Sequence, residues 1–127
     1  MNKKVLVVED DETLREIYAL KLAMEGFNVT TASDGLQALE AVRSSAPDLI
    51  ILDMMMPRLS GLQFLRRYAQ AGLSSPAKIL VASNKTFRPE IEEATRLGAS
   101  EYLVKSRITP DDLVARVHKH LATREPG

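Results

Sequence analysis

A chain of 127 residues with 45% hydrophobic and 27% charged side chains has the composition of one globular domain, which excludes disordered, collagen-like and mucin-like proteins. Its 17 basic residues balance its 17 acidic residues, so we expect this domain not to bind nucleic acid directly. The chain has no cysteine, which excludes disulfide frameworks, thiol catalysis and cysteine-bound metals.

The first apolar run, residues 5–8, is too short for the core of a signal peptide or for a helix that crosses a membrane. We therefore expect a cytoplasmic protein with no membrane partner. No internal repeat or change of composition divides the chain, so residues 1–122 are predicted to form one domain. Residues 123–127 are predicted to be a C-terminal tail or the start of a linker.

The first half of the chain alternates between strand and helix patterns. Residues 3–8 and 27–31 are short segments with many apolar and β-branched residues, which is typical of strands. Residues 11–25, and the segment that begins at Ser33-Asp34-Gly35, carry apolar residues at helical spacing. The side chains predicted to face the core are Leu14, Ile17, Leu20 (or Lys21 through its stem) and Met24 on the first helix, and Leu36, Leu39 and Val42 on the second.

A third strand is predicted at residues 49–53, where four apolar residues end in Asp53. The run is too short for a core helix and does not alternate, which favours a parallel strand buried on both faces. An aspartate at the carboxyl end of such a strand caps the next helix in some proteins and carries out the chemistry in others. The residues at the other strand ends must decide between these two interpretations.

The second half of the chain continues the alternation. A helix follows Ser60-Gly61, a strand covers residues 77–82, a helix runs from residue 89 to 97, a strand covers residues 100–104, and a last helix opens at residues 109–112. The predicted inward side chains are Leu62, Leu65 and Tyr68 or Ala69 on the third helix, and Leu113, Val114, Val117 and Leu121 on the last. Five strands that alternate with five helices predict an α/β fold, with a doubly wound five-stranded parallel sheet flanked by five helices.

Polar residues stand at four of the predicted strand ends. Glu9 and Asp10 follow the first strand, Asp53 the third, Ser83 the fourth and Lys105 the fifth. Because the carboxyl ends of parallel strands meet at one edge of the sheet, we expect these side chains to lie close together. The three acids and the lysine sum to a charge of about −2 at neutral pH, which calls for a divalent cation. Carboxylate oxygens are hard ligands, so Mg²⁺ is favoured over zinc.

The predicted metal also indicates the reactant. Magnesium in proteins keeps several waters and adds phosphate oxygens to its coordination shell, so we expect a phosphoryl group. The hydroxyl of Ser83 and the ammonium of Lys105 are suited to hold its oxygens. Asp53 is predicted to lie between them as the nucleophile that forms an acyl phosphate.

Four sequence features now stand in order: the acids EDD at residues 9–11, D-x-x-x-P at residues 53–57, the hydroxyl of Ser83, and YLVK at residues 102–105 before the last helix. Together they resemble the receiver domain of bacterial two-component response regulators, in register from residue 3 to about residue 121. The resemblance implies a receiver domain over residues 1–122 with the flavodoxin-like strand order 2-1-3-4-5.

The resemblance implies a phosphoacceptor that takes a phosphoryl group onto Asp53 from the histidine of a sensor kinase or phosphotransfer protein. Such a domain is a regulator and not an enzyme, although its own phosphorylation and dephosphorylation depend on Mg²⁺. The metal would be bound by Asp10, Asp53 and the backbone carbonyl of Met55, with Glu9 acting through water.

The same resemblance implies how the signal spreads. Ser83 would close on the phosphoryl group and Tyr102 would turn inward behind it. These movements would change the surface formed by the fourth helix, the fifth strand and the fifth helix. That surface would control a downstream output protein or domain, and a homodimer formed on phosphorylation is a further candidate assembly.

Three positions depart from the commonest pattern of that family. Ser83 replaces a more frequent threonine and keeps the hydroxyl. Asn84 stands where a small residue is usual, so its amide would narrow the entrance to the site or donate a hydrogen bond. Ser106 replaces the proline that normally follows the lysine. We expect a trans peptide between Lys105 and Ser106, because a cis bond before a non-proline residue costs about 2.5–4 kcal/mol.

Three other functions are compatible with this fold and less favoured. A flavodoxin-type cofactor binder needs backbone donors after its first strand, where the acids at residues 9–12 would repel phosphate. A magnesium-dependent aspartyl phosphatase needs a second acid two residues after the nucleophile, where this chain has Met55. A receiver-like interaction module that acts without phosphorylation usually lacks the acids or the lysine, and this chain has both.

Overall fold

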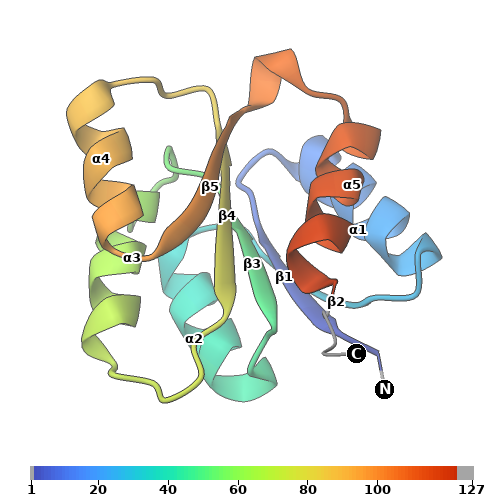
Figure 1. Ribbon diagram of the computed structural model, residues 1–127, viewed down its shortest axis with the longest axis horizontal. Coiled ribbons are helices and arrows are strands. Elements are labelled where there is room, and N and C mark those ends of the chain that lie inside the picture. The colour runs from blue at the N-terminus through green and yellow to red at the C-terminus, as the bar shows by residue number, and fades with distance from the viewer. Residues whose placement is uncertain (1, 123–127) are drawn as a thin grey trace.

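The computed structural model describes residues 2–122 and contains one five-stranded parallel sheet (Figure 1). The strands lie side by side in the order β2-β1-β3-β4-β5, which confirms the predicted strand order and fold class. The predicted tail, residues 123–127, lies outside the described residues. The strand bounds are β1 Lys4–Val8, β2 Asn28–Ala32, β3 Leu49–Leu52, β4 Lys78–Ser83 and β5 Ala99–Val104.

Five helices cover the two faces of the sheet. Helices α1 and α5 pack on one face, and α2, α3 and α4 pack on the other (Figure 1). A single 3₁₀ turn, η1, joins β5 to α5. Within residues 2–122, no helix combines the length and the apolar composition that a membrane crossing requires. The helix bounds are α1 Glu12–Met24, α2 Gly35–Ser45, α3 Gly61–Gln70, α4 Arg88–Arg96, α5 Pro110–Leu121 and η1 Lys105–Arg107.

The core has two layers that share the central strands. On β3, Leu49 and Ile51 face the α1/α5 layer, while Ile50 and Leu52 face the α2/α3/α4 layer. All four side chains are at most 1% exposed. A strand with helices on both faces has no polar face, which explains why this segment reads as an uninterrupted apolar run.

The inward face predicted for α1 is correct at Leu14, which packs against the core, and wrong at the other apolar positions. Ile17, Leu20 and Met24 are 37%, 63% and 75% exposed, whereas the buried residues are Tyr18 and Leu22. The helix carries two apolar stripes, one spaced i, i+3, i+7 and the other i, i+4. The second stripe faces the core because α1 packs against β2 and α5 along that side, and helical spacing alone does not specify this packing.

The predictions for the other helices hold in most positions. On α2, Leu36 is 45% exposed, contrary to expectation, because the small residues Ala38 and Ala41 lie against the sheet instead. On α3 the inward residue is Tyr68 and not Ala69. The remaining predicted inward residues are buried or partly buried against the core: Leu39, Val42, Leu62, Leu65, Leu113, Val114, Val117 and Leu121.

Candidate phosphoacceptor site

The carboxyl ends of the strands meet at one edge of the sheet, as the sequence predicts. Val8 on β1 pairs with Leu52 on β3, so the residues that follow them, Glu9 and Asp53, leave the sheet at the same level. The Asp53 N–H extends the ladder by donating to the Val8 carbonyl at 3.1 Å. Glu9 and Asp53 are only 2% and 3% exposed. Two carboxyl side chains are thus held side by side almost out of contact with solvent.

A third acid completes a cluster at this edge. One carboxylate oxygen from each of Glu9, Asp10 and Asp53 lies within 4.8 Å of the others, and Asp10 is exposed. Three hard oxygen donors so close together fit the coordination preferences of Mg²⁺. The cluster lines an open hollow of about 360 Å³, which Met55 and Lys105 also line. The predicted metal-binding acids are therefore brought together, with room above them.

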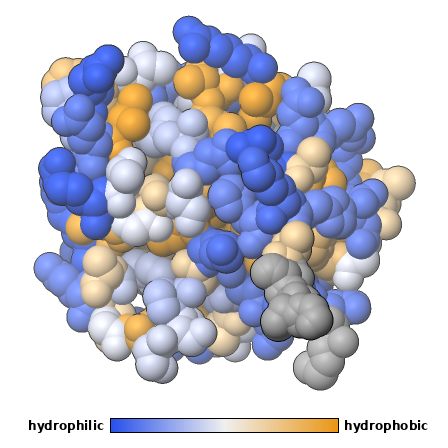
Figure 2. All heavy atoms as spheres, viewed as in Figure 1, coloured by the Kyte–Doolittle hydropathy of each residue, from blue (hydrophilic) through white to orange (hydrophobic). Residues whose placement is uncertain are grey.

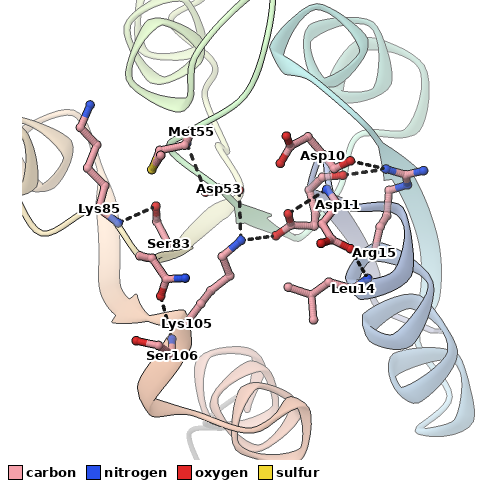
Figure 3. A network of polar contacts seen from close by, with 12 residues as sticks. Asp10, Asp11, Leu14, Arg15, Asp53, Met55, Ser83, Lys85, Lys105 and Ser106 are labelled. Carbon is pink, nitrogen blue, oxygen red and sulfur yellow. Dashed lines mark hydrogen bonds and ion pairs between the residues drawn. The ribbon is translucent and has the colours of Figure 1, made fainter.

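Lys105 reaches into the cluster from the end of β5. Its Nζ lies 2.9 Å from Glu9 Oε1 and 3.1 Å from Asp53 Oδ2 (Figure 3). Burial acts against the ammonium most strongly, but the hydrogen bond to Glu9 and the charges of both acids outweigh it and raise the pKa of Lys105. Lys105 is therefore a fixed positive charge that holds the phosphoacceptor candidate in place.

The pKa of Glu9 is governed mainly by its burial. Burial raises the pKa of Glu9, the hydrogen bond from Lys105 offsets this only in part, and the charge of Asp53 raises it further. Arg15 on α1 helps to hold Glu9 in place, because its guanidinium donates a hydrogen bond to the Glu9 backbone carbonyl at 2.8 Å. The sequence analysis missed Arg15. Its place on the helix that follows the acids, six residues after Glu9, was the available signal.

The loop between β3 and α3 is pressed against the site by close backbone contacts. A Cβ added at Gly61 would lie 2.4 Å from the Asp53 carbonyl oxygen and 2.6 Å from the Met54 Cα. The Gly61 N–H donates to the Met54 carbonyl at 3.0 Å, and the Met55 N–H donates to Asp53 Oδ1 at 3.2 Å. Only a residue without a side chain fits at Gly61, so this glycine determines how Asp53 and Met55 sit.

An ion pair between the exposed Arg58 and the buried Asp34 holds the far end of the same loop. Arg58 has a left-handed φ of 67°, which is strained for a residue with a side chain. Its guanidinium donates twice to Asp34 Oδ2, once from Nε at 2.9 Å. Asp34, 2% exposed, also caps α2 by accepting the Gln37 N–H at 2.9 Å. The sequence analysis missed this pair, because a separation of 24 residues leaves no local signal.

The other wall of the site is built from β4 and β5. Ser83 is fully buried, and its Oγ accepts the Lys85 N–H at 3.2 Å. The Tyr102 hydroxyl donates to the Lys85 carbonyl at 2.5 Å, so the ring points toward the segment after β4. Burial raises the pKa of Tyr102. Ser83 and Tyr102, the two residues predicted to act as a switch, are therefore both hydrogen-bonded to the backbone of Lys85. Their switching role stays a prediction.

Asn84 and Ser106, the two unusual positions, contact one another. Asn84 Oδ1 accepts the Ser106 N–H at 2.7 Å, a bond drawn as the dashed line to Ser106 in Figure 3. The peptide between Lys105 and Ser106 is trans, as is every peptide bond in the described range, which confirms that expectation. The predicted role of the Asn84 amide was to narrow the entrance or to donate. It does line the hollow above Asp53, but toward Ser106 it accepts.

Comparisons with known proteins agree with this geometry. The family model described as the response regulator receiver domain matches residues 5–118. The alkaline phosphatase synthesis transcriptional regulatory protein PhoP of Bacillus subtilis is 37% identical over 125 residues, which cover 98% of this chain and 51% of PhoP. The DNA-binding response regulator MtrA of Mycolicibacterium smegmatis is 38% identical over 125 residues, which cover 98% of this chain and 53% of MtrA. This chain therefore spans about half the length of these curated relatives.

Solved structures show the same fold. The chemotaxis response regulator CheY4 of Vibrio cholerae superposes with a TM-score of 0.85 at 29% identity, covering 95% of this chain and all of that one (100%). A CheY-like receiver domain protein from Methanospirillum hungatei superposes with a TM-score of 0.88, covering 96% of this chain and 95% of that one. At 20% identity, the second likeness concerns the fold alone.

Proposed function

The chain belongs to the response regulator receiver domain family, and from this premise we propose that it is a phosphoacceptor switch. In this proposal Asp53 takes a phosphoryl group from the histidine of a sensor kinase or a phosphotransfer protein. The observation that carries the proposal is the environment of Asp53. Its carboxyl group is buried, is paired with Lys105 at 3.1 Å and borders an open hollow beside two further acids.

The proposed reaction is an in-line transfer to a carboxylate oxygen of Asp53. A new bond forms between that oxygen and phosphorus, the bond from phosphorus to the donor breaks, and the donor leaves with the electron pair. Lys105 and the Met55 N–H each hold one oxygen of Asp53, which fixes the orientation of the nucleophile. This orientation lowers the entropic cost of reaching the transition state.

The phosphoryl oxygens carry negative charge during transfer, and a cation at the acid cluster would support the reaction. The carboxylates of Asp10 and Asp53 and the backbone carbonyl of Met55 would hold Mg²⁺, with Glu9 acting through water. The bound ion would neutralise the phosphoryl charge. The closeness of the three acids supports this assignment, because one carboxylate oxygen from each of Glu9, Asp10 and Asp53 lies within 4.8 Å of the others.

Phosphorylation is proposed to shift the population of two conformations. The phosphoryl group attracts the Ser83 hydroxyl, which then gives up the bond that it accepts from the Lys85 N–H. Because the Tyr102 hydroxyl is bonded to the carbonyl of the same Lys85, movement there reaches β5. The affected surface is formed by α4, β5 and α5, where Figure 2 shows hydrophilic side chains with smaller hydrophobic patches between them.

The output is proposed to lie in a downstream protein or domain that reads this surface, or in a second copy of the chain that pairs through it. The two named relatives are described as a transcriptional regulatory protein and as a DNA-binding response regulator, and each is about twice the length that matches here. By analogy the output is control of transcription. The balanced charge of this chain argues that nucleic acid is not bound by this domain itself.

The proposal is tested by incubating the protein with acetyl phosphate and Mg²⁺ and measuring its intact mass. We expect the addition of one phosphoryl group and none in Asp53→Asn. The matched control is Asp34→Asn, which changes an acid of equal burial outside the hollow and should still be phosphorylated. Equal labelling of Asp53→Asn would refute the assignment of Asp53. A wild-type protein that takes no phosphoryl group from any donor would favour an interaction module that acts without phosphorylation.

A further inference from the structure

The 3₁₀ turn that carries Lys105 has an unusual cap. The first N–H groups of a helical turn have no partner within the turn and need one from outside. Val104, the residue before η1, provides no side-chain hydrogen bond. The Ser106 N–H instead donates to Asn84 Oδ1, 22 residues away in the sequence, at 2.7 Å. The acceptor therefore comes from the segment after β4 and not from the turn itself.

This bond anchors the backbone next to a charged side chain in the site. Lys105 is the first residue of η1, and its Nζ bonds to Glu9 and Asp53. A lysine side chain has four rotatable bonds, so the position of its ammonium depends on how firmly its backbone is held. With Ser106 fastened to Asn84, Lys105 is restrained at both its backbone and its ammonium.

The same hydrogen bond joins the segment after β4 to the turn after β5. Asn84 directly follows Ser83, whose hydroxyl is proposed to move toward the phosphoryl group. A displacement of the backbone at residues 83–84 would pull on the Ser106 N–H and so on the turn that begins with Lys105. The side chain of Asn84 is exposed and borders the hollow, where it is free to make this contact without a change in the core.

We propose that Asn84 is a positioning residue, which caps the Lys105–Arg107 turn through the Ser106 N–H and couples the segment after β4 to the placement of the Lys105 ammonium. The inference builds on the proposed function for one of its readouts. It also requires a residue with an N–H at position 106. Asn84 and Ser106 therefore act as a pair, in which the asparagine side chain supplies the acceptor and the serine backbone supplies the donor.

The experiment compares Asn84→Ala, which removes the acceptor, with Ser106→Pro, which removes the donor, and with the double variant. Ser106→Ala is the matched control, because it removes the hydroxyl and keeps the N–H. In metal-free, unphosphorylated protein, NMR measures hydrogen exchange of the residue 106 amide and the order parameter of the Lys105 side chain. A rapid-quench assay with acetyl phosphate and Mg²⁺ measures the rate of phosphorylation.

In Asn84→Ala we expect exchange of the Ser106 amide about threefold to tenfold faster, the range that corresponds to the net strength of one hydrogen bond. The Lys105 order parameter should fall, and phosphorylation should slow. Ser106→Ala should leave the exchange rate and the Lys105 order parameter unchanged. The effects of Asn84→Ala and Ser106→Pro on Lys105 should overlap in the double variant, because each single change already breaks the same bond.

Two outcomes would overturn the proposal. One is an unchanged Lys105 order parameter in Asn84→Ala, and the other is a double variant in which the two effects simply add. If Asn84 only narrows the entrance, Asn84→Ala should accelerate phosphorylation and leave Lys105 as ordered as before. Failure of the wild-type protein to accept a phosphoryl group would refute the proposed function, and the two NMR readouts would still decide the role of Asn84.

Discussion

Two regions of the molecule each hold a carboxyl group almost out of contact with solvent, and they shift its pKa in opposite directions. Asp34, at the start of α2, is 2% exposed, and so is Glu9, at the end of β1. The backbone N–H of Gln37 and the guanidinium of Arg58 lower the pKa of Asp34. Burial raises the pKa of Glu9, and the hydrogen bond from Lys105 does not reverse this. At equal solvent exposure, the loss of hydration therefore dominates at Glu9, whereas hydrogen bonds dominate at Asp34.

The difference separates a structural acid from a site acid. Asp34 holds a strained loop against α2, and its own hydrogen bonds compensate for its burial. Glu9 and Asp53 share Lys105 and repel one another, and Asp10 adds a third carboxylate within 4.8 Å, a cost that the folded chain bears. Such a cost is common at functional sites, where stability is given up for a pre-arranged charge distribution. The following experiments test this contrast.

The largest expected effect comes from Asp34→Ala. It removes the cap of α2 and leaves the Arg58 guanidinium without its carboxylate, so the free energy of unfolding should fall by about 2–4 kcal/mol. Urea unfolding measures the change. Asp34→Asn keeps an acceptor for the Gln37 N–H and should lose less. A loss in Asp34→Ala as small as that in Asp34→Asn would mean that the hydrogen bond from the Gln37 N–H contributes little.

Magnesium should stabilise the site region and leave the Asp34 region unaffected. At a free Mg²⁺ concentration ten times its dissociation constant, a ligand that binds only the folded state adds about 1.4 kcal/mol of stability, or about 5 °C in melting temperature. Thermal unfolding with and without Mg²⁺ measures this shift. Asp10→Ala should remove most of it, whereas Glu92→Ala, at an exposed acid outside the cluster, should not. An equal shift in both variants would place the metal elsewhere.

Asparagine substitutions should have opposite signs in the two regions. In EDTA, Asp53→Asn should raise the free energy of unfolding by about 1 kcal/mol, because it relieves repulsion with Glu9 and Asp10 and frees Lys105 for Glu9. Asp34→Asn should lower it under the same conditions. Saturating Mg²⁺ should reduce or reverse the advantage of Asp53→Asn over wild type. A destabilised Asp53→Asn protein in EDTA would show that Lys105 already balances the cluster.

The smallest expected effect is a difference in pH dependence. Below the ordinary Glu9 pKa of 4.5 both the folded and the unfolded state carry the proton. As pH rises from 4.5 through the higher folded pKa, the unfolded chain loses its proton first, so the contribution of Glu9 to stability falls and then stays low. For Asp34 the folded pKa lies below the ordinary 3.8, so its contribution is present above 3.8 and is lost as pH falls through the folded pKa.

Urea unfolding at several pH values in EDTA measures both slopes. The stability of wild type minus that of Glu9→Gln should decrease as pH rises above 4.5. The corresponding difference for Asp34→Asn should instead decrease as the solution is acidified below 3.8. If the difference in stability between wild type and Glu9→Gln does not change with pH, the Glu9 carboxyl group has the same pKa in the folded and unfolded states.

The strand ends were predictable because their placement follows from a rule of the fold. Once residues 5–8 and 49–52 are recognised as parallel strands, the residues that follow them must emerge at the same edge. The closeness of Glu9, Asp53 and Lys105 therefore required no knowledge of side-chain packing. The trans peptide before Ser106 was predictable for a similar reason, since it depends on local covalent energetics.

The face of α1 was not predictable in the same way. Its sequence supplies two apolar stripes, and each satisfies helical spacing equally well. The packing of α1 against β2 and α5 buries Tyr18 and Leu22 and leaves Leu20 and Met24 in solvent. Periodicity describes a single helix, whereas the choice between stripes depends on the neighbours of that helix.

The resemblance to receiver domains implied the strand order. By itself, the sequence determined the alternation of strands and helices and the set of polar residues at one edge of the sheet. These features depend on short-range patterns and on the handedness of the connections. Only the tertiary structure decided that Asp34 meets Arg58 and that Asn84 caps the turn at Ser106. Each of these contacts joins residues more than 20 positions apart through single side chains. Their distances depend on how loops close on the assembled core, which no local pattern encodes.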